Sequence, residues 1–230
     1  MKEVIEVVFI DIKPYSESSL WVCFFSEKDG LQNGIIKGGK KKKVKPLVLG
    51  LYQATVYSRP TSGLVNILQI ERSEALEETY NSPVKILIAF FVAESIKSFL
   101  YQEVVDGSFF KFIKGHILGL NKEKRTQRFP VLFLASLITY SGHKPLKNED
   151  ERLFSLDLMT GVFNAVSPSD KTIHDASLVQ SIYDSFYNIV QLNKGMERKV
   201  FDMLLEYCSY HIPGYNSNKS VEVIRETLYD

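Results

Sequence analysis

Six lysine side chains are concentrated in one short stretch of a chain whose formal net charge is only +1. The stretch opens with Lys37-Gly38-Gly39 and closes at Pro46, and we call residues 37–46 the lysine loop. Its cations are Lys37, Lys40, Lys41, Lys42, Lys43 and Lys45. Unpaired ammonium groups are costly to bury and repel one another, so the stretch is predicted to project into water. Lysines that neutralise phosphates release condensed counterions, which gives salt-sensitive and largely sequence-independent affinity. A loop that only keeps the protein soluble is the plainer alternative.

A second basic group lies in the middle of the chain and is opposed only by Glu123. Its members are Lys111, Lys114, Lys122, Lys124, Arg125 and Arg128. One interpretation is solvated helix ends, where cations also suit the helix dipole. The other is a second phosphate-contacting surface, or a site for an acidic partner peptide, because the arginine fork matches carboxylates. For this role we select Lys122, Lys124, Arg125 and Arg128.

No catalytic or metal-binding constellation is visible. The histidines, His116, His143, His174 and His211, are scattered and none lies in a His-Glu-x-x-His spacing. The lysine loop also lacks the spacing of a nucleotide-binding phosphate loop. Cys23 and Cys208 are the only cysteines, which excludes a disulfide framework and a zinc site built from cysteines. We therefore predict no enzyme activity, no metal and no cofactor, and a nuclease is the least favoured class.

Length and composition are those of an ordinary folded protein. The chain has 230 residues, of which 45% are hydrophobic, enough for a sizeable buried core. Its longest apolar stretches, residues 84–93 and 131–138, fall short of the roughly 20 residues that a membrane span needs. The start of the chain lacks the pattern of a secretory signal, and the cysteine usage fits a reducing compartment. We expect a soluble, cytoplasmic protein.

The first 80 or so residues contain five strand-like segments separated by turn signals. The segments are residues 4–12, 20–25, 31–36, 51–57 and 64–70. Five short strands with a basic loop predict an OB-fold, a small barrel whose face and loops hold oligonucleotides. Arg59, in the turn before the fifth segment, joins the lysines in the predicted DNA-contact set.

Aromatic side chains on such a barrel can stack on unpaired bases. The candidates are Tyr15, Trp21, Phe25, Tyr52 and Tyr57. In the segment 20–25 both faces are apolar, so one face is expected to fill the barrel and the other to meet either bases or a helical domain. For Trp21 we favour packing against the helical domain.

The pattern changes from strands to helices near Asn81. Ser82 is a suitable N-cap and Pro83 suits the first helical position. Apolar residues then recur at helical spacing from residue 83, after Asp106 and over 129–140, and again over 176–190, over 195–210 and after residue 220. A small β-hairpin is expected in an insertion at about 146–168. The predicted architecture is α+β, with an OB-fold barrel (1–80) packed on a mainly helical domain (81–230).

Several short motifs follow one another along nearly the whole chain. In the barrel half these motifs are Tyr15-Ser16-Glu17-Ser18, Gly30-Leu31, Ile36-Lys37-Gly38-Gly39-Lys40-Lys41 and Gly63-Leu64. In the helical half they are Arg128-Phe129 leading to Ser141-Gly142-His143-Lys144-Pro145, then His211-Ile212-Pro213-Gly214 and Lys219-Ser220-Val221-Glu222-Val223-Ile224. The order and spacing of these motifs resemble the RecO family of recombination mediators.

The resemblance implies a function, a set of partners and an association with the nucleoid. RecO-like proteins bind single- and double-stranded DNA and anneal complementary strands. With RecR they help load RecA onto DNA coated by single-stranded-DNA-binding protein, whose acidic C-terminal tail they capture. The lysine loop matches the family's basic loop, and Arg128, with Arg125 and Lys124, stands near the expected tail site. The alternative is an adaptor with an OB-fold that bridges RecR and single-stranded-DNA-binding protein but has little DNA affinity of its own.

The sequence departs from the family in one respect. Many RecO-like chains place a four-cysteine zinc finger after the turn that ends here at Pro145, whereas residues 146–162 contain no cysteine. We expect the hairpin over residues 154–163 to replace the finger by ordinary packing.

Overall fold

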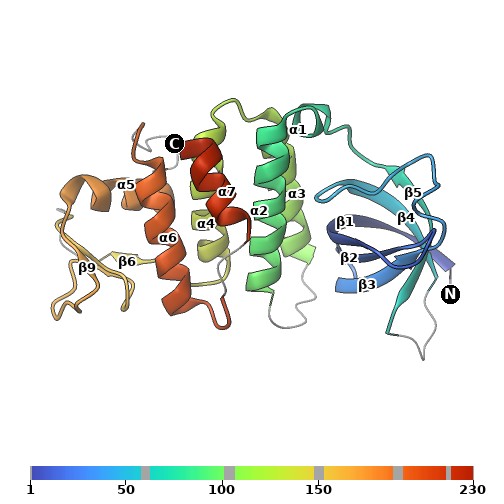
Figure 1. The fold of residues 1–230 in the computed structure, drawn as a ribbon. Helices are drawn as coiled ribbons and strands as arrows, with labels where there is room; N and C mark the ends of the chain where they lie inside the picture. The colour runs from blue at the N-terminus through green and yellow to red at the C-terminus, as the bar shows by residue number, and fades with distance from the viewer. Residues whose placement is uncertain are drawn as a thin grey trace. The chain divides into compact units, whose positions relative to one another are not determined.

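The computed structural model describes residues 2–57, 63–100, 107–147, 153–188, 194–215 and 219–229. The chain forms two compact units, residues 1–123 and 124–230 (Figure 1). The first unit contains β1 (Lys2–Pro14), β2 (Leu20–Ser26), β3 (Gly30–Ile36), β4 (Leu51–Tyr57), β5 (Val65–Arg72), α1 (Glu77–Tyr80), α2 (Pro83–Phe99) and α3 (Gly107–Lys122). The second contains η1 (Thr126–Arg128), α4 (Phe129–Tyr140), β6 (Leu146–Lys147), β7 (Leu156–Asp157), β8 (Val162–Phe163), β9 (Thr172–Ile173), α5 (Ala176–Tyr187), α6 (Glu197–His211), α7 (Ser220–Ile224) and η2 (Arg225–Tyr229).

The five strands of the first unit close into a barrel in the order β1-β2-β3-β5-β4. All pairs are antiparallel except β3 and β5, which run parallel over residues 34–36 and 65–67. Alternate residues of each strand point inward and form one buried cluster. Its largest members are Phe9, Phe24 and Tyr52, whose rings pack against one another. The predicted OB-type barrel and the α+β class are confirmed.

Helices α2 and α3 pack on one side of the barrel within the first unit. Phe25, on the outer face of β2, meets the ring of Phe109 on α3 with 5.4 Å between ring centroids. Lys114 on the same helix pairs with Glu6 of β1 at 2.9 Å. Helix α2 begins as predicted, because the side chain of Ser82 accepts a hydrogen bond from the backbone N–H of Lys85.

The division between the compact units does not coincide with the predicted domain boundary near Asn81. Helices α1 to α3 belong to the same unit as the barrel, since α2 packs on β1, α3 packs on β2, and α1 packs on both of these helices. A functional division into residues 1–80 and 81–230 stays a prediction. Among the described residues, no helix has both the length and the apolar character needed to cross a membrane.

The second unit consists of helices around α4 and a small sheet. Helix α4 contacts both α5 and α6. Strands β7 and β8 pair antiparallel, which confirms the predicted hairpin, and β6 and β9 extend it to four strands in the order β6-β8-β7-β9. Buried Phe163 of this sheet packs edge-on against Tyr183 of α5.

Asp157 organises the loops around this small sheet. Its side chain is fully buried and accepts hydrogen bonds from the backbone N–H groups of Met159, Thr160 and Ser169 and from the Ser169 hydroxyl. Burial alone would raise the pKa of Asp157, but these donors lower it to about 2. A charged carboxylate therefore ties together the loops around this small sheet.

Candidate nucleic-acid interface

The lysine loop is a folded turn structure that leaves the barrel directly after β3. The backbone N–H of Gly39 donates to the carbonyl of Ile36 at 3.1 Å, and the N–H of Lys40 donates to that of Ser18, also at 3.1 Å. Gly38 has a φ of +65°, a conformation that favours glycine. A side chain at Gly39 would come within 3.0 Å of the Ile36 carbonyl oxygen. The two glycines thus allow the chain to turn tightly over the end of the barrel.

Three of the six lysines hold the loop in place through backbone carbonyl groups. The Nζ of Lys40 donates to the carbonyl of Ser16 at 2.8 Å, and that of Lys42 donates to the carbonyl of Leu68. The Nζ of Lys45 donates to the carbonyl of Lys40 within the loop itself. Partial burial lowers the pKa of Lys42. The loop therefore bridges from the β1–β2 turn to β5.

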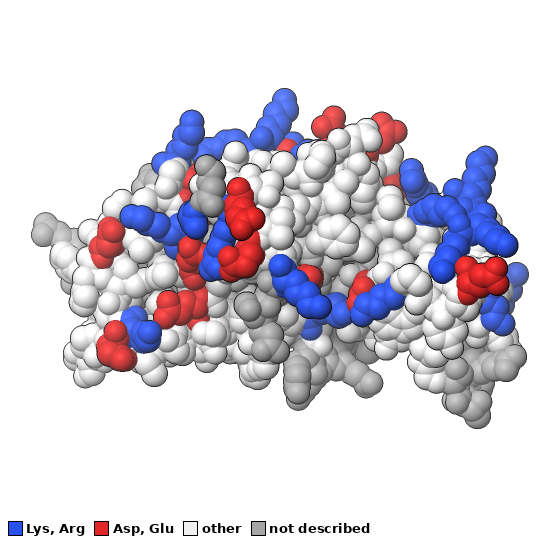
Figure 2. All heavy atoms as spheres, in the orientation of Figure 1, with Lys and Arg blue, Asp and Glu red and all other residues white. Residues whose placement is uncertain are grey.

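The other three lysines, Lys37, Lys41 and Lys43, are exposed. Within the described part of the chain their ammonium groups have no hydrogen bond or ion pair. Because they need not give up a protein partner, these three are the best placed to meet phosphates. Figure 2 shows a dense group of lysine and arginine side chains over the barrel.

Tyr52 anchors the far end of the lysine loop. Its hydroxyl donates to the carbonyl of Lys45 at 2.9 Å and accepts from the backbone N–H of Leu47 at 3.0 Å. The ring is only 1% exposed and belongs to the barrel core. The prediction that Tyr52 could stack on bases is therefore wrong, because the side chain points into the barrel and its hydroxyl holds the loop by hydrogen bonds.

Replacing Tyr52 with phenylalanine is expected to loosen the loop while preserving the barrel. It would leave the Lys45 carbonyl and the Leu47 N–H without this partner, at a cost of about 1–2 kcal/mol in the free energy of unfolding. Denaturant unfolding together with hydrogen exchange at Leu47 measures both effects. Tyr15→Phe, a change at an exposed ring, is the control. Unaltered exchange at Leu47 would contradict the anchoring role.

The remaining aromatic candidates differ in exposure. Phe25 is fully buried between β2 and α3, so its predicted stacking role is wrong as well. Tyr15 is 59% exposed and Tyr57 38% exposed, whereas Trp21 is half-buried. Three of the five candidates are therefore accessible to a ligand.

The second basic group does not act as one cluster. Lys111 and Lys114 form ion pairs with Glu27 and Glu6 of the barrel, at 3.4 and 2.9 Å, and so contribute to packing within the first unit. Lys122 is exposed at the end of α3. Arg59, which was predicted to contact DNA, lies outside the described residues.

The other predicted cations of this group belong to the second unit. Lys124 and Arg125 are exposed, and Arg125 lies 3.7 Å from the largely buried carboxylate of Glu197. Arg128, in η1, is half-buried. Their role in binding DNA or a partner peptide stays a prediction.

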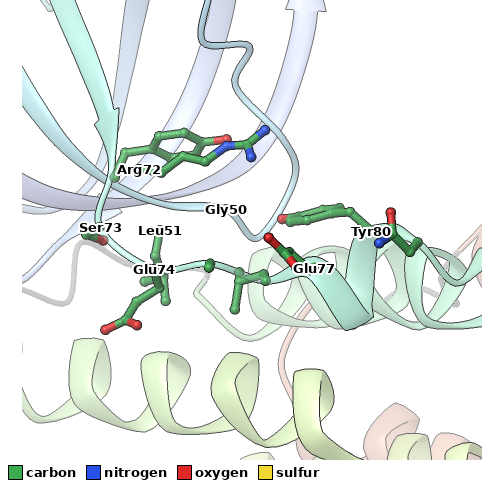
Figure 3. A pocket seen from close by; sticks show the side chains of 11 residues that line it. Gly50, Leu51, Arg72, Ser73, Glu74, Glu77 and Tyr80 are labelled. Atoms are coloured by element: carbon green, nitrogen blue, oxygen red, sulfur yellow. The ribbon is translucent and has the colours of Figure 1, made fainter.

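A cavity of about 350 Å³ lies beside the anchored end of the loop, where the ends of β4 and β5 approach α1 (Figure 3). Its lining includes Arg72, the carboxylates of Glu74 and Glu77, and the ring of Tyr80. A lining with two carboxylates and one arginine disfavours a phosphate ligand, so we leave this cavity out of the interface.

Sequence reasoning did not find the partners that hold the loop. The carbonyl groups of Ser16, Ser18 and Leu68 carry no residue-type signal, because any residue provides a backbone carbonyl. Only the closure of the barrel brings the β1–β2 turn, the lysine loop and β5 together.

A closed five-stranded barrel in the strand order β1-β2-β3-β5-β4 is of the OB type. Residues 1–75 match the family described as Recombination protein O N terminal. The whole chain is similar to the DNA repair protein RecO of Christiangramia forsetii, with 23% identity over 96% of this chain and 97% of the relative. RecO of Flavobacterium psychrophilum is 24% identical over 97% of this chain and 98% of its own length. The chain is thus similar to RecO proteins over nearly its whole length, as its motifs predicted.

Proposed function

We propose that the chain is a DNA-binding recombination mediator that acts in recombinational DNA repair. The observation that carries the proposal is the lysine loop, which presents Lys37, Lys41 and Lys43 to solvent from a rigid barrel. Similarity over nearly the whole chain to proteins named DNA repair protein RecO supports a role in repair. DNA is then the polyanion that the loop binds.

Strand annealing suits this surface. Two complementary strands meet only when the repulsion between their phosphate backbones is reduced, and clustered lysines reduce it without selecting a sequence. No bond is made or broken. Among the described residues no group of three or more histidine, cysteine, aspartate or glutamate side chains could hold a metal ion.

The proposed partners are RecR, RecA and single-stranded-DNA-binding protein. Together with RecR the chain would help load RecA onto DNA coated by single-stranded-DNA-binding protein. The exposed cations of the second unit, Lys124 and Arg125, are the proposed contacts for the acidic tail of the coating protein. Arg128 and Lys122 complete the proposed set.

Annealing of two complementary oligonucleotides tests the proposal. One strand carries a fluorophore and the other a quencher, and annealing is followed with and without bound single-stranded-DNA-binding protein. We expect the chain to accelerate annealing of both bare and coated strands. An adaptor without DNA affinity would bind RecR and the coating protein yet leave bare strands unaffected, and that result would overturn the proposal. Cleavage of the labelled strand would instead indicate an enzyme.

A further inference from the structure

Four side chains form a continuous row around the outer face of the barrel. The strand register places Trp21 opposite Ile35, Ile35 opposite Asn66, and Asn66 opposite Tyr57. Their sequence neighbours point into the barrel core, namely Val22, Ile36, Val65, Ile67 and Val56. Because side chains alternate along a strand, the four residues face outward.

Lysines stand at both ends of this row and along one edge. The register continues from Trp21 to Lys13 on β1, and from Tyr57 to Lys2 at the start of the same strand. The Nζ of Lys13 lies 5.3 Å from the centre of the Trp21 ring. The lysine loop begins at Lys37, two residues after Ile35. A ligand that lies along the row thus meets cations on several sides.

The acidic side chain close to the Trp21 end is already neutralised. Asp11 lies 3.1 Å from the Nζ of Lys13 and 3.0 Å from that of Lys97. Burial would raise the pKa of Asp11, but the hydrogen bonds from these two lysines lower it, so the carboxylate stays paired and ionised at neutral pH. It therefore presents little free negative charge to a phosphate.

The helices leave this row uncovered in part. On β2, Phe25 is fully buried against α3, while Trp21, on the same face four residues earlier, is only half-buried. At the other end Tyr57 is 38% exposed. Three strand spacings separate the backbones of Trp21 and Tyr57 across the row, a distance of about 14 Å along the sheet. An extended single strand can therefore reach both rings at once.

We propose that Trp21 and Tyr57, with Ile35 and Asn66 between them, form a platform for unpaired bases. The inference rests on the proposed DNA-binding function and adds a preference to it. The lysine loop attracts any phosphate backbone, whereas stacking requires bases that are not already stacked and paired in a duplex. The platform thus makes the surface favour single-stranded over double-stranded DNA.

The tryptophan provides a direct readout, because the chain contains a single Trp. Its fluorescence is measured during titration with oligothymidylate, with an abasic oligonucleotide of equal length, and with duplex DNA. Stacking of thymine on Trp21 is expected to quench the emission. The abasic strand and the duplex present phosphates without free bases, so they are expected to bind through lysines with little quenching. Equal quenching by all three ligands would overturn the platform.

Alanine variants test the same inference through affinity. Tyr57→Ala is expected to weaken oligothymidylate binding about tenfold, within the range measured for base-stacking aromatics, and to leave duplex affinity nearly unchanged. Trp21→Ala is expected to have the same effect on both affinities. If loss of the half-buried Trp21 unfolds the barrel, the variant at the exposed Tyr57 still tests the platform. Phe90→Ala, at an aromatic residue of α2 that is 47% exposed, is the matched control and should change neither affinity.

The outcomes separate this inference from the proposed function. Strong binding of every DNA ligand, with Tyr57→Ala indistinguishable from Phe90→Ala, would refute the platform and leave the lysine loop in its role. Absence of DNA binding by the unaltered chain would refute both. Loss of binding to a protein partner in Tyr57→Ala, with unchanged DNA affinities, would reassign the row to protein contact.

Discussion

The triple variant Lys37→Ala, Lys41→Ala, Lys43→Ala is expected to bind single-stranded DNA about 100-fold more weakly at 0.1 M salt. Each phosphate neutralised on a single strand contributes about 0.7 to the slope of log affinity against log salt, so three contacts contribute a slope of about 2. Between about 1 M and 0.1 M salt, this slope corresponds to about two decades of affinity. Duplex affinity should fall at least as much. Fluorescence anisotropy with strands of different sequence measures both, and the loss should not depend on sequence.

A charge-matched variant controls for the change in net charge. Lys28, Lys111 and Lys114 belong to the same compact unit but form ion pairs with Glu3, Glu27 and Glu6. Replacing these three with alanine removes the same total charge. If both triple variants lose equal affinity, the effect comes from overall charge, and the lysine loop has no special role.

Asp157→Ala is expected to lower the free energy of unfolding of the second unit by about 3 kcal/mol or more. The change leaves the backbone N–H groups of Met159, Thr160 and Ser169 without their charged acceptor in a buried site. Denaturant unfolding and hydrogen exchange at Thr160 and Ser169 measure the loss. Asp170→Ala, at an exposed neighbour, is the control, and equal stability of the two variants would contradict the organising role of Asp157.

The same carboxylate predicts the direction of a pH effect. The pKa of Asp157 is about 2 in the folded chain, below the ordinary value of 3.8. A depressed pKa contributes stability above the unfolded value, and the contribution is lost as pH falls from about 4 to about 2. Over this pH interval the melting temperature of the unaltered chain should therefore fall more steeply than that of Asp157→Asn. Thermal unfolding at a series of pH values measures both.

The alternation of inward-facing and outward-facing residues along each strand predicted most features of the barrel. Cys23 and Phe25 share the outer face of β2 with Trp21, and both are buried, as expected from the apolar character of that face, whereas Trp21 is half-buried. The same signal was available for Tyr52, which alternates with polar Gln53 and so shares the inner face of β4 with Ala54. Its assignment as a base-stacking residue ignored that pattern.

Residue type alone could not predict which lysines hold the loop through carbonyl groups and which are exposed. Lys40 and Lys42 donate to carbonyl groups of Ser16 and Leu68, which lie far away in sequence and come close only when the barrel closes. Lys41, between them, is exposed. The row from Trp21 to Tyr57 likewise depends on register across four strands, which no local pattern contains.

The salt dependence of single-strand affinity tests the central claim most directly. Titrating oligothymidylate binding from low to high salt should give a linear fall of log affinity with log salt for the unaltered chain. The variant without Lys37, Lys41 and Lys43 should show a slope shallower by about 2, since three phosphate contacts are lost. A slope near zero for the unaltered chain, or the same slope for both proteins, would contradict the conclusion that the lysine loop binds the DNA backbone.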